Sequence, residues 1–274
     1  MLFAASALLA GCATSYSASH PATVLPPGRW EFGADVTGTI PVVLVADAVA
    51  AEKDVNTALT AVSKGGSIKV NLNAGIAESL AVATLVADPP LPQAEVNIRY
   101  GLPIPADVGV RINQEQLRAE LYVQFLHGTW SGVAGAGYMH KWYWSGPVGL
   151  TAFTPLGALQ RNDGDLTVLF GRDWRSWSFY FGPKLMYSNF SGAGLAQLAS
   201  PQVMSVEIDP TLEKGHAQSL IPEVVAGFRV GTPLVKFTFE IDVVRTFYSA
   251  ELLGQKDDLG VVMVVPTVGV ALLP

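Results

Sequence analysis

Residues 94–113 constrain the fold more than any other stretch, because a two-residue alternation continues on both sides of a proline-rich turn. One phase is apolar and the other is largely charged, as shown by Val96, Ile98, Tyr100, Leu102, Val108, Val110 and Ile112 against Glu95, Asn97, Arg99, Asp107 and Arg111. Successive side chains of a strand point to opposite faces, so the pattern predicts a β-hairpin in a sheet with one apolar and one charged face. The fold and the function both depend on which face points inward.

The composition indicates apolar surroundings beyond those of an ordinary core. Of the 274 residues, 50% are hydrophobic and 15% are charged, and the mean hydropathy is +0.34. The chain is therefore more apolar than is usual for a soluble protein of this size. The net charge of -6 and the isoelectric point near 5.2 provide no basic surface, so nucleic acid is not expected as a partner.

Cys12 is the only cysteine, so the chain forms neither an internal disulfide nor a cysteine-based metal cluster. It follows a short apolar run, residues 2–10, that is typical of a signal peptide and too short to span a bilayer. Leu9-Ala10-Gly11-Cys12 resembles the lipobox of bacterial lipoproteins, which implies a processed segment over residues 1–12 and a lipid on Cys12. An ordinary signal peptide is the alternative. Residues 13–27, rich in Ser, Thr, Ala and Pro, are predicted to form a flexible tether.

The folded domain is predicted to span residues 28–274. Alternation like that of the hairpin predicts further strands over residues 28–38, 116–125, 130–142, 166–172, 176–188, 220–230, 235–243 and 261–272. Residues 39–92 differ and are predicted to be a long loop excursion. Within it, a near-helical apolar period predicts a surface helix over residues 43–62, and alternation predicts a short strand over residues 68–73.

The connections between these strands alternate in length. Short ones lie at residues 102–106, 127–129, 173–175 and 231–233, and long ones at 39–92, 141–165, 189–219 and 247–259. This arrangement is similar to bacterial outer-membrane β-barrels, which have short periplasmic turns at one end and long outer loops at the other. The resemblance implies an all-β, antiparallel, up-and-down transmembrane barrel of about ten strands, with eight or twelve as alternatives. It also implies outer-membrane lipids and the barrel-assembly machinery as partners, and outer loops that present the functional surface.

Alternation alone does not separate a soluble barrel, apolar inside, from a membrane barrel, apolar outside. The tryptophans favour the membrane barrel because all of them lie near strand ends: Trp30, Trp130, Trp174 and Trp177 beside short turns or at the first strand, and Trp142 and Trp144 where a strand enters a long loop. Interfacial belts place aromatic rings at such positions. We therefore predict that these six residues form an aromatic girdle.

In a membrane barrel the charged phase lines the lumen. The predicted lumenal network comprises Glu95, Arg99, Asp107, Arg111, Arg118, Glu120, Lys184, Glu223, Arg229, Lys236, Glu240 and Asp242, with Glu31 and Asp35 from the first strand. Both signs occur in similar number, which predicts paired, hydrogen-bonded charges. Side chains fill a barrel of about ten strands, so a filled lumen is expected and an open porin channel is not.

Motifs that carry chemistry are sparse. The sequence has no phosphate-binding loop, no HExxH and no CxxC, so no cofactor and no metal site are expected. Gly135-x-Gly137 resembles the start of the dinucleotide-binding motif GxGxxG, but His140 stands where the third glycine would be. Small residues that give a curved strand room are the simpler interpretation. Asp163 and Asp165 in the sequence NDGD could bind calcium, although turn formation is the simpler interpretation.

The main functional hypothesis is a structural or surface-interaction role. A soluble, lipocalin-like lipid binder held by a lipid anchor is the first alternative. A lipid-modifying barrel enzyme is the second, and His140 near Ser145 is the only constellation that the sequence offers for it. His140 shares the phase of Ala136 and Tyr138, which would face lipid, so no catalytic residue is assigned.

Overall fold

The computed structural model describes residues 17–41, 92–113, 116–142, 160–174, 176–192, 215–252 and 255–274. Eleven strands lie within these ranges: β1 (Trp30–Thr37), β2 (Ile40–Pro41), β3 (Gln93–Gly101), β4 (Ala106–Ile112), β5 (Gln116–Leu126), β6 (Ser131–Trp142), β7 (Gln160–Asp173), β8 (Trp177–Gly192), β9 (Gly215–Gly231), β10 (Val235–Leu252) and β11 (Gln255–Leu272). No helix in the described ranges has the length and hydropathy needed to cross a membrane.

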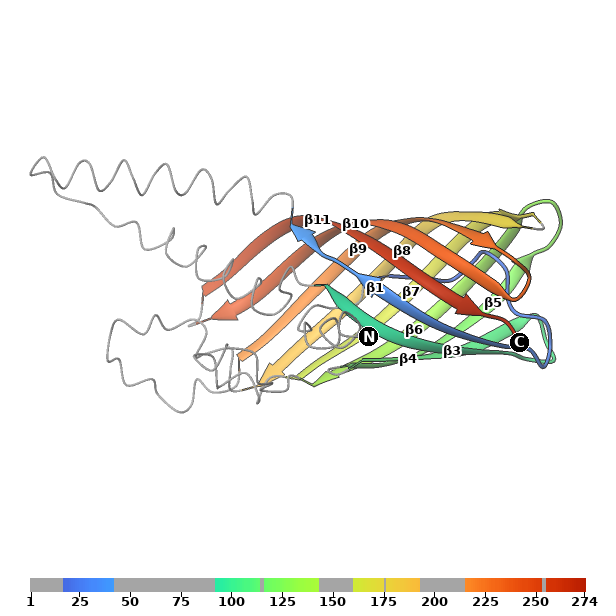
Figure 1. Ribbon diagram of the computed structural model, residues 1–274. Coiled ribbons are helices and arrows are strands. Elements are labelled where there is room, and N and C mark those ends of the chain that lie inside the picture. The colour runs from blue at the N-terminus through green and yellow to red at the C-terminus, as the bar shows by residue number, and fades with distance from the viewer. Residues whose placement is uncertain are drawn as a thin grey trace, which may run out of the picture.

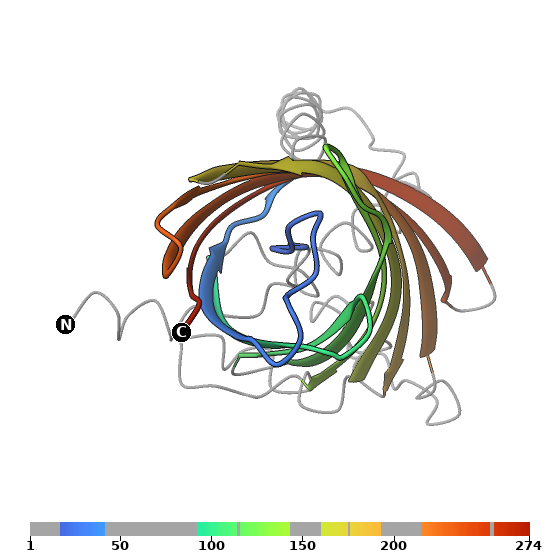
Figure 2. The ribbon, with the colours of Figure 1, turned by 90° about the vertical axis from the view of Figure 1, so that its right-hand side faces the viewer.

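The sheet closes on itself. From β3 onward each strand pairs antiparallel with the next in sequence, and β1 pairs with both β3 and β11 (Figures 1 and 2). The closing register runs from Phe32↔Leu272 to Thr37↔Thr267. Ten strands form the wall, and the two-residue β2 adds to β11. The predicted all-β, up-and-down antiparallel barrel of about ten strands is confirmed.

The two ends of the barrel differ. Residues 102–105, 127–130, 174–176 and 232–234 connect strands at one end, named here the turn end, where the C-terminus also lies (Figure 1). At the other end, named here the loop end, the separation in sequence is long between β2 and β3, β6 and β7, and β8 and β9, and it is short between β4 and β5 and between β10 and β11. The wall is also taller on one side, because β8 to β11 have 16 to 18 residues while β1, β3 and β4 have 7 to 9.

Some predicted connections were wrong. The expected loop over residues 247–259 is mostly paired strand, since β10 and β11 remain in register from Phe247↔Gly260 to Leu252↔Gln255. The expected loops over residues 141–165 and 189–219 are shorter than predicted, because β7 begins at Gln160 and β9 at Gly215. Of the excursion over residues 39–92, Ile40 and Pro41 pair with β11. The predicted helix over residues 43–62 and strand over residues 68–73 lie outside the described residues.

The polarity of the two faces is clearest along β10. Phe239, Ile241 and Val243 are 49%, 55% and 47% exposed on the outside, whereas Glu240 and Asp242 are 2% and 0% exposed on the inside. The other long strands also expose apolar side chains outward. Their buried phase combines polar residues such as Lys184 and Glu223 with an apolar group towards the loop end, namely Met186, Ile221, Val244, Met263 and Val265. The hydrophobic face is therefore the outer face, and the charged face is the interior.

Residues 17–25, which precede β1, lie inside the barrel. Ser17, Ala18 and His20 are fully buried and Leu25 is 6% exposed, and the segment that leads into β1 crosses the interior (Figure 2). This differs from the flexible tether predicted over residues 13–27, of which the structure describes residues 17–27. Residues 17–25 are named here the lumenal segment.

Candidate functional site in the barrel lumen

Most of the predicted lumenal residues point inward and are buried. Eleven of the twelve have exposures of 5% or less, namely Glu95, Arg99, Asp107, Arg111, Arg118, Glu120, Lys184, Glu223, Arg229, Glu240 and Asp242. Lys236 is only half-buried because it lies second in β10, at the turn end. Glu31 and Asp35 on β1 are buried as well.

Arg99 connects the acids near the turn end. Its Nη1 lies 3.0 Å from Oε1 of Glu31, and its Nη2 donates to Oδ2 of Asp107. The second oxygen of Glu31 lies 3.0 Å from Nη2 of Arg229. Ion pairs and charge-assisted hydrogen bonds together offset the large cost of burying these ions.

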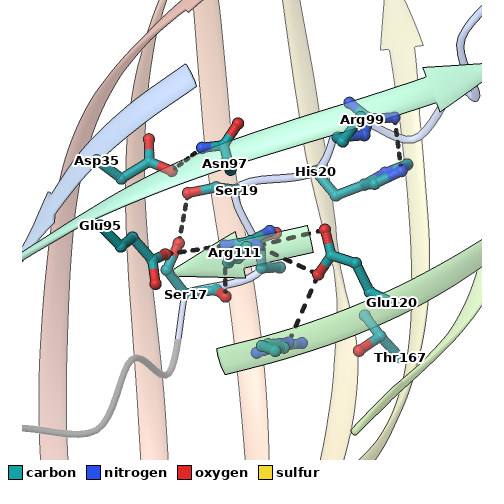
Figure 3. Close-up of polar contacts among 12 residues, drawn as sticks. Ser17, Ser19, His20, Asp35, Glu95, Asn97, Arg99, Arg111, Glu120 and Thr167 are labelled. Atoms are coloured by element: carbon teal, nitrogen blue, oxygen red, sulfur yellow. Dashed lines mark hydrogen bonds and ion pairs between the residues drawn. The ribbon is translucent and has the colours of Figure 1, made fainter. Parts of the chain in front are cut away.

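Arg111 and Arg118 form a second set of ion pairs towards the loop end. Arg111 lies 3.2 Å from both Glu95 and Glu120, measured between guanidinium nitrogen and carboxylate oxygen. Arg118 lies 3.5 Å from Glu120 and 3.0 Å from Asp165 on β7. Glu120 is thus shared by two arginines, and Figure 3 shows its contact with Arg111.

The taller side of the wall carries a third pair. Nζ of Lys184 on β8 lies 3.2 Å from Oε2 of Glu223 on β9, and these two residues are register partners in the sheet. Asp242 is fully buried on the next strand, β10.

Glu240 on β10 fastens one end of the lumenal segment. Its Oε1 accepts hydrogen bonds of 2.7 Å from the Ser17 hydroxyl and from the Ala18 amide, and its Oε2 accepts one of 2.9 Å from the Ser19 amide. Ser19 has φ of 39°, in the left-handed region that residues other than glycine rarely adopt. Successive amides directed at one carboxylate form an anion-binding nest. The hydroxyl of Tyr180 donates a further hydrogen bond of 2.6 Å to Oε2.

Arg111 holds the same part of the lumenal segment from the opposite wall. Its Nη1 donates to the Ser17 carbonyl at 3.2 Å (Figure 3). Its Nη2 donates to the Ala18 carbonyl. Glu240 therefore binds the amides and Arg111 binds the carbonyls of adjacent peptide groups. These contacts satisfy backbone groups that would otherwise be buried without a partner.

His20 is a lumenal residue that the sequence analysis missed. Its ring stacks on Tyr122, with centroids 3.6 Å apart. Nδ1 donates to the Pro21 carbonyl at 2.5 Å, and Nε2 lies 2.7 Å from Nη2 of Arg99. Oδ1 of Asp107 lies 3.1 Å from the same nitrogen, and Oδ2 of Asp107 accepts from Nη2 of Arg99.

Further contacts secure the lumenal segment near the turn end. The Leu25 amide donates to Oδ2 of Asp107 at 3.0 Å, and the Thr23 hydroxyl donates to Asp173 at 2.7 Å. Just after the segment, the Gly28 amide donates to the Gly101 carbonyl at 2.8 Å. Asp107 thus fastens the turn-end part of the segment, as Glu240 fastens its other part.

Two lumenal tyrosines lie against glycines of the neighbouring strand. Tyr122 pairs with Gly135, and Tyr180 pairs with Gly227. A Cβ at either glycine would overlap the facing ring. The glycines of Gly135-x-Gly137 therefore make room for lumenal side chains, which is the curved-strand interpretation of that motif.

Asp163 and Asp165 were expected in a loop, and this was wrong. Both lie in β7 and point into the lumen, where Asp163 pairs with Arg161 at 2.8 Å and Asp165 with Arg118 at 3.0 Å. Among the described residues, no group of three or more His, Cys, Asp and Glu side chains is arranged to hold a metal ion.

Four of the predicted girdle residues lie at the turn end. Trp30, Trp130 and Trp177 are 46%, 45% and 37% exposed on the outer surface. Trp174 stacks on Trp177 with centroids 3.8 Å apart. The Trp142 side chain and Trp144 lie outside the described residues.

The predicted enzymatic pair is only partly described. His140 lies on β6 in the outward phase, and its Nδ1 is 2.8 Å from Oδ1 of Asn162 on β7. Asn162 also accepts from the Tyr138 hydroxyl at 2.8 Å. Ser145 lies outside the described residues, as does Cys12.

Comparison with known proteins identifies no family. No protein-family model matches the chain, and no curated protein matches it. Among solved structures, Neisserial surface protein A (NspA) is 9% identical over 89% of this chain and 96% of its own, with a TM-score of 0.33. The outer membrane protease OmpT from Escherichia coli is 8% identical over 92% and 100%, with a TM-score of 0.37. The attachment invasion locus protein Ail of Yersinia pestis is 9% identical over 91% and 100%, with a TM-score of 0.28. Similarity at this level carries no functional assignment.

Proposed function

We propose that this protein is an integral β-barrel of a bacterial outer membrane, with a structural or surface-interaction role and a lumen filled by its own residues. The observation that carries the proposal is the inverted polarity of the barrel. Its outer face exposes large apolar side chains such as Phe239, Ile241 and Leu166, while arginines and carboxylates are buried inside. Hydrocarbon is the solvent that such an outer face requires.

The closed sheet supports the same environment. A strand edge with unpaired amides and carbonyls is costly in a bilayer, and closure removes it. Here β1 pairs with β11 and completes the ring. An aromatic cluster lies at the turn end, where Phe179 contacts Trp130 and Trp174, and Trp174 stacks on Trp177. Such a cluster fits an interfacial belt.

The polarity of the inner and outer faces of the barrel also argues against the soluble, lipocalin-like alternative. A lipocalin-like barrel binds its ligand in an apolar interior and presents charge to water. In this barrel Arg99, Arg111 and Arg118 are 2% exposed or less, and the outer wall would leave a continuous apolar surface in water.

A filled lumen argues for interaction and against transport. Ion pairs and the lumenal segment occupy the interior where an open porin would hold water. By analogy with outer-membrane barrels, the turn end would face the periplasm and the loop end the cell exterior. The long connections at the loop end would then form the interaction surface, and the proposal assigns no catalytic residue.

The lipid on Cys12 and the barrel-assembly machinery are finer parts of the proposal. The lipobox-like sequence before Cys12 supports lipidation. Metabolic labelling with a tagged palmitate should label the wild-type protein and leave Cys12→Ser unlabelled. Depletion of the assembly machinery should reduce the amount of folded barrel. Equal labelling of both proteins would contradict lipidation of Cys12. Unchanged folding after depletion would contradict a role of the assembly machinery.

Membrane fractionation of the Cys12→Ser variant tests the proposal itself. Without any lipid on Cys12, the barrel should still float with outer membranes and require detergent for extraction. It should also migrate differently in gels before and after boiling, because a closed barrel resists detergent. Release of Cys12→Ser into buffer without detergent would refute the membrane barrel and favour the soluble one.

A further inference from the structure

The lumenal segment enters the barrel at its turn end. The Gly28 amide bonds to the carbonyl of Gly101, the last residue of β3. Three residues earlier, the Leu25 amide bonds to Asp107, the second residue of β4. Since β4 begins at the turn end, this part of the segment lies at the same level of the barrel.

The other end of the segment lies near the loop end of the same wall. The carbonyls of Ser17 and Ala18 accept hydrogen bonds from Arg111, the penultimate residue of β4. Arg111 also pairs with Glu95, the third residue of β3, which begins at the loop end. The segment therefore follows β4 from its first residues to its last along the shorter side of the wall. On the taller side, Ser17 and Ala18 bond to Glu240, the sixth residue of β10 from the turn end.

Among the described residues, buried side chains surround the lumenal segment. Large side chains with exposures of 2% or less, including Arg99, Tyr122, Arg118 and Tyr180, fill the interior around the segment. A chain that reversed at Ser17 would have to displace these side chains and break their ion pairs.

We infer that the polypeptide threads the barrel, so that the chain before Ser17 leaves through the loop end. This inference deepens the proposed function and rests on it for the orientation in the membrane. If the loop end faces outward, the N-terminal chain is displayed at the cell surface beside the long connections.

Epitope tags on intact and permeabilised cells test the exit. One tag is inserted between Thr14 and Ser15, a second between Ser200 and Pro201 in the connection from β8 to β9, and a third at Ile104 in the turn from β3 to β4. The first two should bind antibody on intact cells, and the third only after permeabilisation. Slow hydrogen exchange at the Ala18 and Ser19 amides of each purified protein checks that the tag has not displaced the segment.

The outcomes separate the inference from the proposed function. If the tag before Ser15 becomes accessible only together with the Ile104 tag, the chain leaves at the turn end and the threading is wrong. If the tag before Ser15 is hidden in both intact and permeabilised cells but is detected after denaturation, that part of the chain lies inside the lumen. This result would also contradict an exit through the loop end. If the Ile104 tag alone binds on intact cells, the proposed orientation fails, while threading stands provided that the other two tags respond together.

Discussion

The carboxylate of Glu240 on β10 accepts a 2.7 Å hydrogen bond from the backbone amide of Ala18, a residue 222 positions earlier in the chain. This contact joins the last third of the barrel wall to the segment that fills its lumen. A buried carboxylate is costly unless it is hydrogen-bonded. Here the partners are supplied by the segment and by Tyr180, so the wall and the segment stabilise each other.

Hydrogen exchange should resolve two separate fastening points. In Glu240→Gln the exchange of the Ala18 and Ser19 amides should be about tenfold to a hundredfold faster, because hydrogen bonds to a charged group contribute about 1.5–3 kcal/mol. In Asp107→Asn the Leu25 amide should respond instead. The measurement is amide exchange by mass spectrometry in detergent micelles. Equal acceleration of all three amides in both variants would mean that the segment leaves the lumen as one unit and would contradict two independent fastenings.

Removal of the lumenal segment should make the barrel conduct. Wild-type protein in planar bilayers should show no steady channel, since residues 17–25 and the ion pairs occupy the lumen. Deletion of residues 17–25 should produce steady single-channel currents. A matched control is Thr23→Ala, which removes only the hydrogen bond to Asp173 near the turn end and should remain silent. Porin-like currents from the wild type would contradict the filled lumen.

The close contacts between tyrosines and glycines should appear in stability measurements. Gly135→Ala and Gly227→Ala place a methyl group against the rings of Tyr122 and Tyr180 and should lower the free energy of unfolding by about 1–3 kcal/mol. Gly164 lies in β7, and no atom lies within 4 Å of the position that an added methyl group would take. Gly164→Ala should therefore change the free energy of unfolding by less than about 0.5 kcal/mol. Urea unfolding in detergent measures both effects.

A double variant separates steric contact from backbone effects at the same position. In Tyr122→Ala the ring is absent, so adding Gly135→Ala should cost much less than it does in the wild type. If the two changes are simply additive, or if Gly164→Ala is equally destabilising, the cost arises from the glycine backbone and the ring contact is not responsible.

Much of the wall was predictable because a strand records its two faces in its alternation. Arg99, Arg111 and Glu120 were assigned to the lumen from phase alone, and they point inward. Tyr122 and Tyr180 share the phase of these charged residues, which is the signal that could have added them to the network. The specific ion pairs were not predictable, because some of them join strands that are not neighbours in the sheet. Arg118 on β5 pairs with Asp165 on β7, and the Asp165 side chain lies over Gly137 on the strand between them, β6.

The lumenal segment could not be found in this way. Residues 13–27 show no alternation and have the composition of a linker, and their burial depends on Glu240 and Arg111, which lie far along the chain. Tertiary pairing also overrode local signals elsewhere. Asp163-Gly164-Asp165 has the residues of a turn, yet it continues β7 because β6 and β8 pair with it on both sides.

The most direct test of the central claim is the solvent that surrounds the outer face of β10. Spin labels are placed singly at Phe237, Phe239, Ile241 and Val243, all of them exposed outward, in protein reconstituted into lipid vesicles. Labels within the membrane should be relaxed strongly by oxygen, which concentrates in hydrocarbon, and weakly by a water-soluble nickel chelate. Predominant relaxation by the chelate at Phe239 and Ile241 would mean that this face meets water, and it would contradict the membrane barrel.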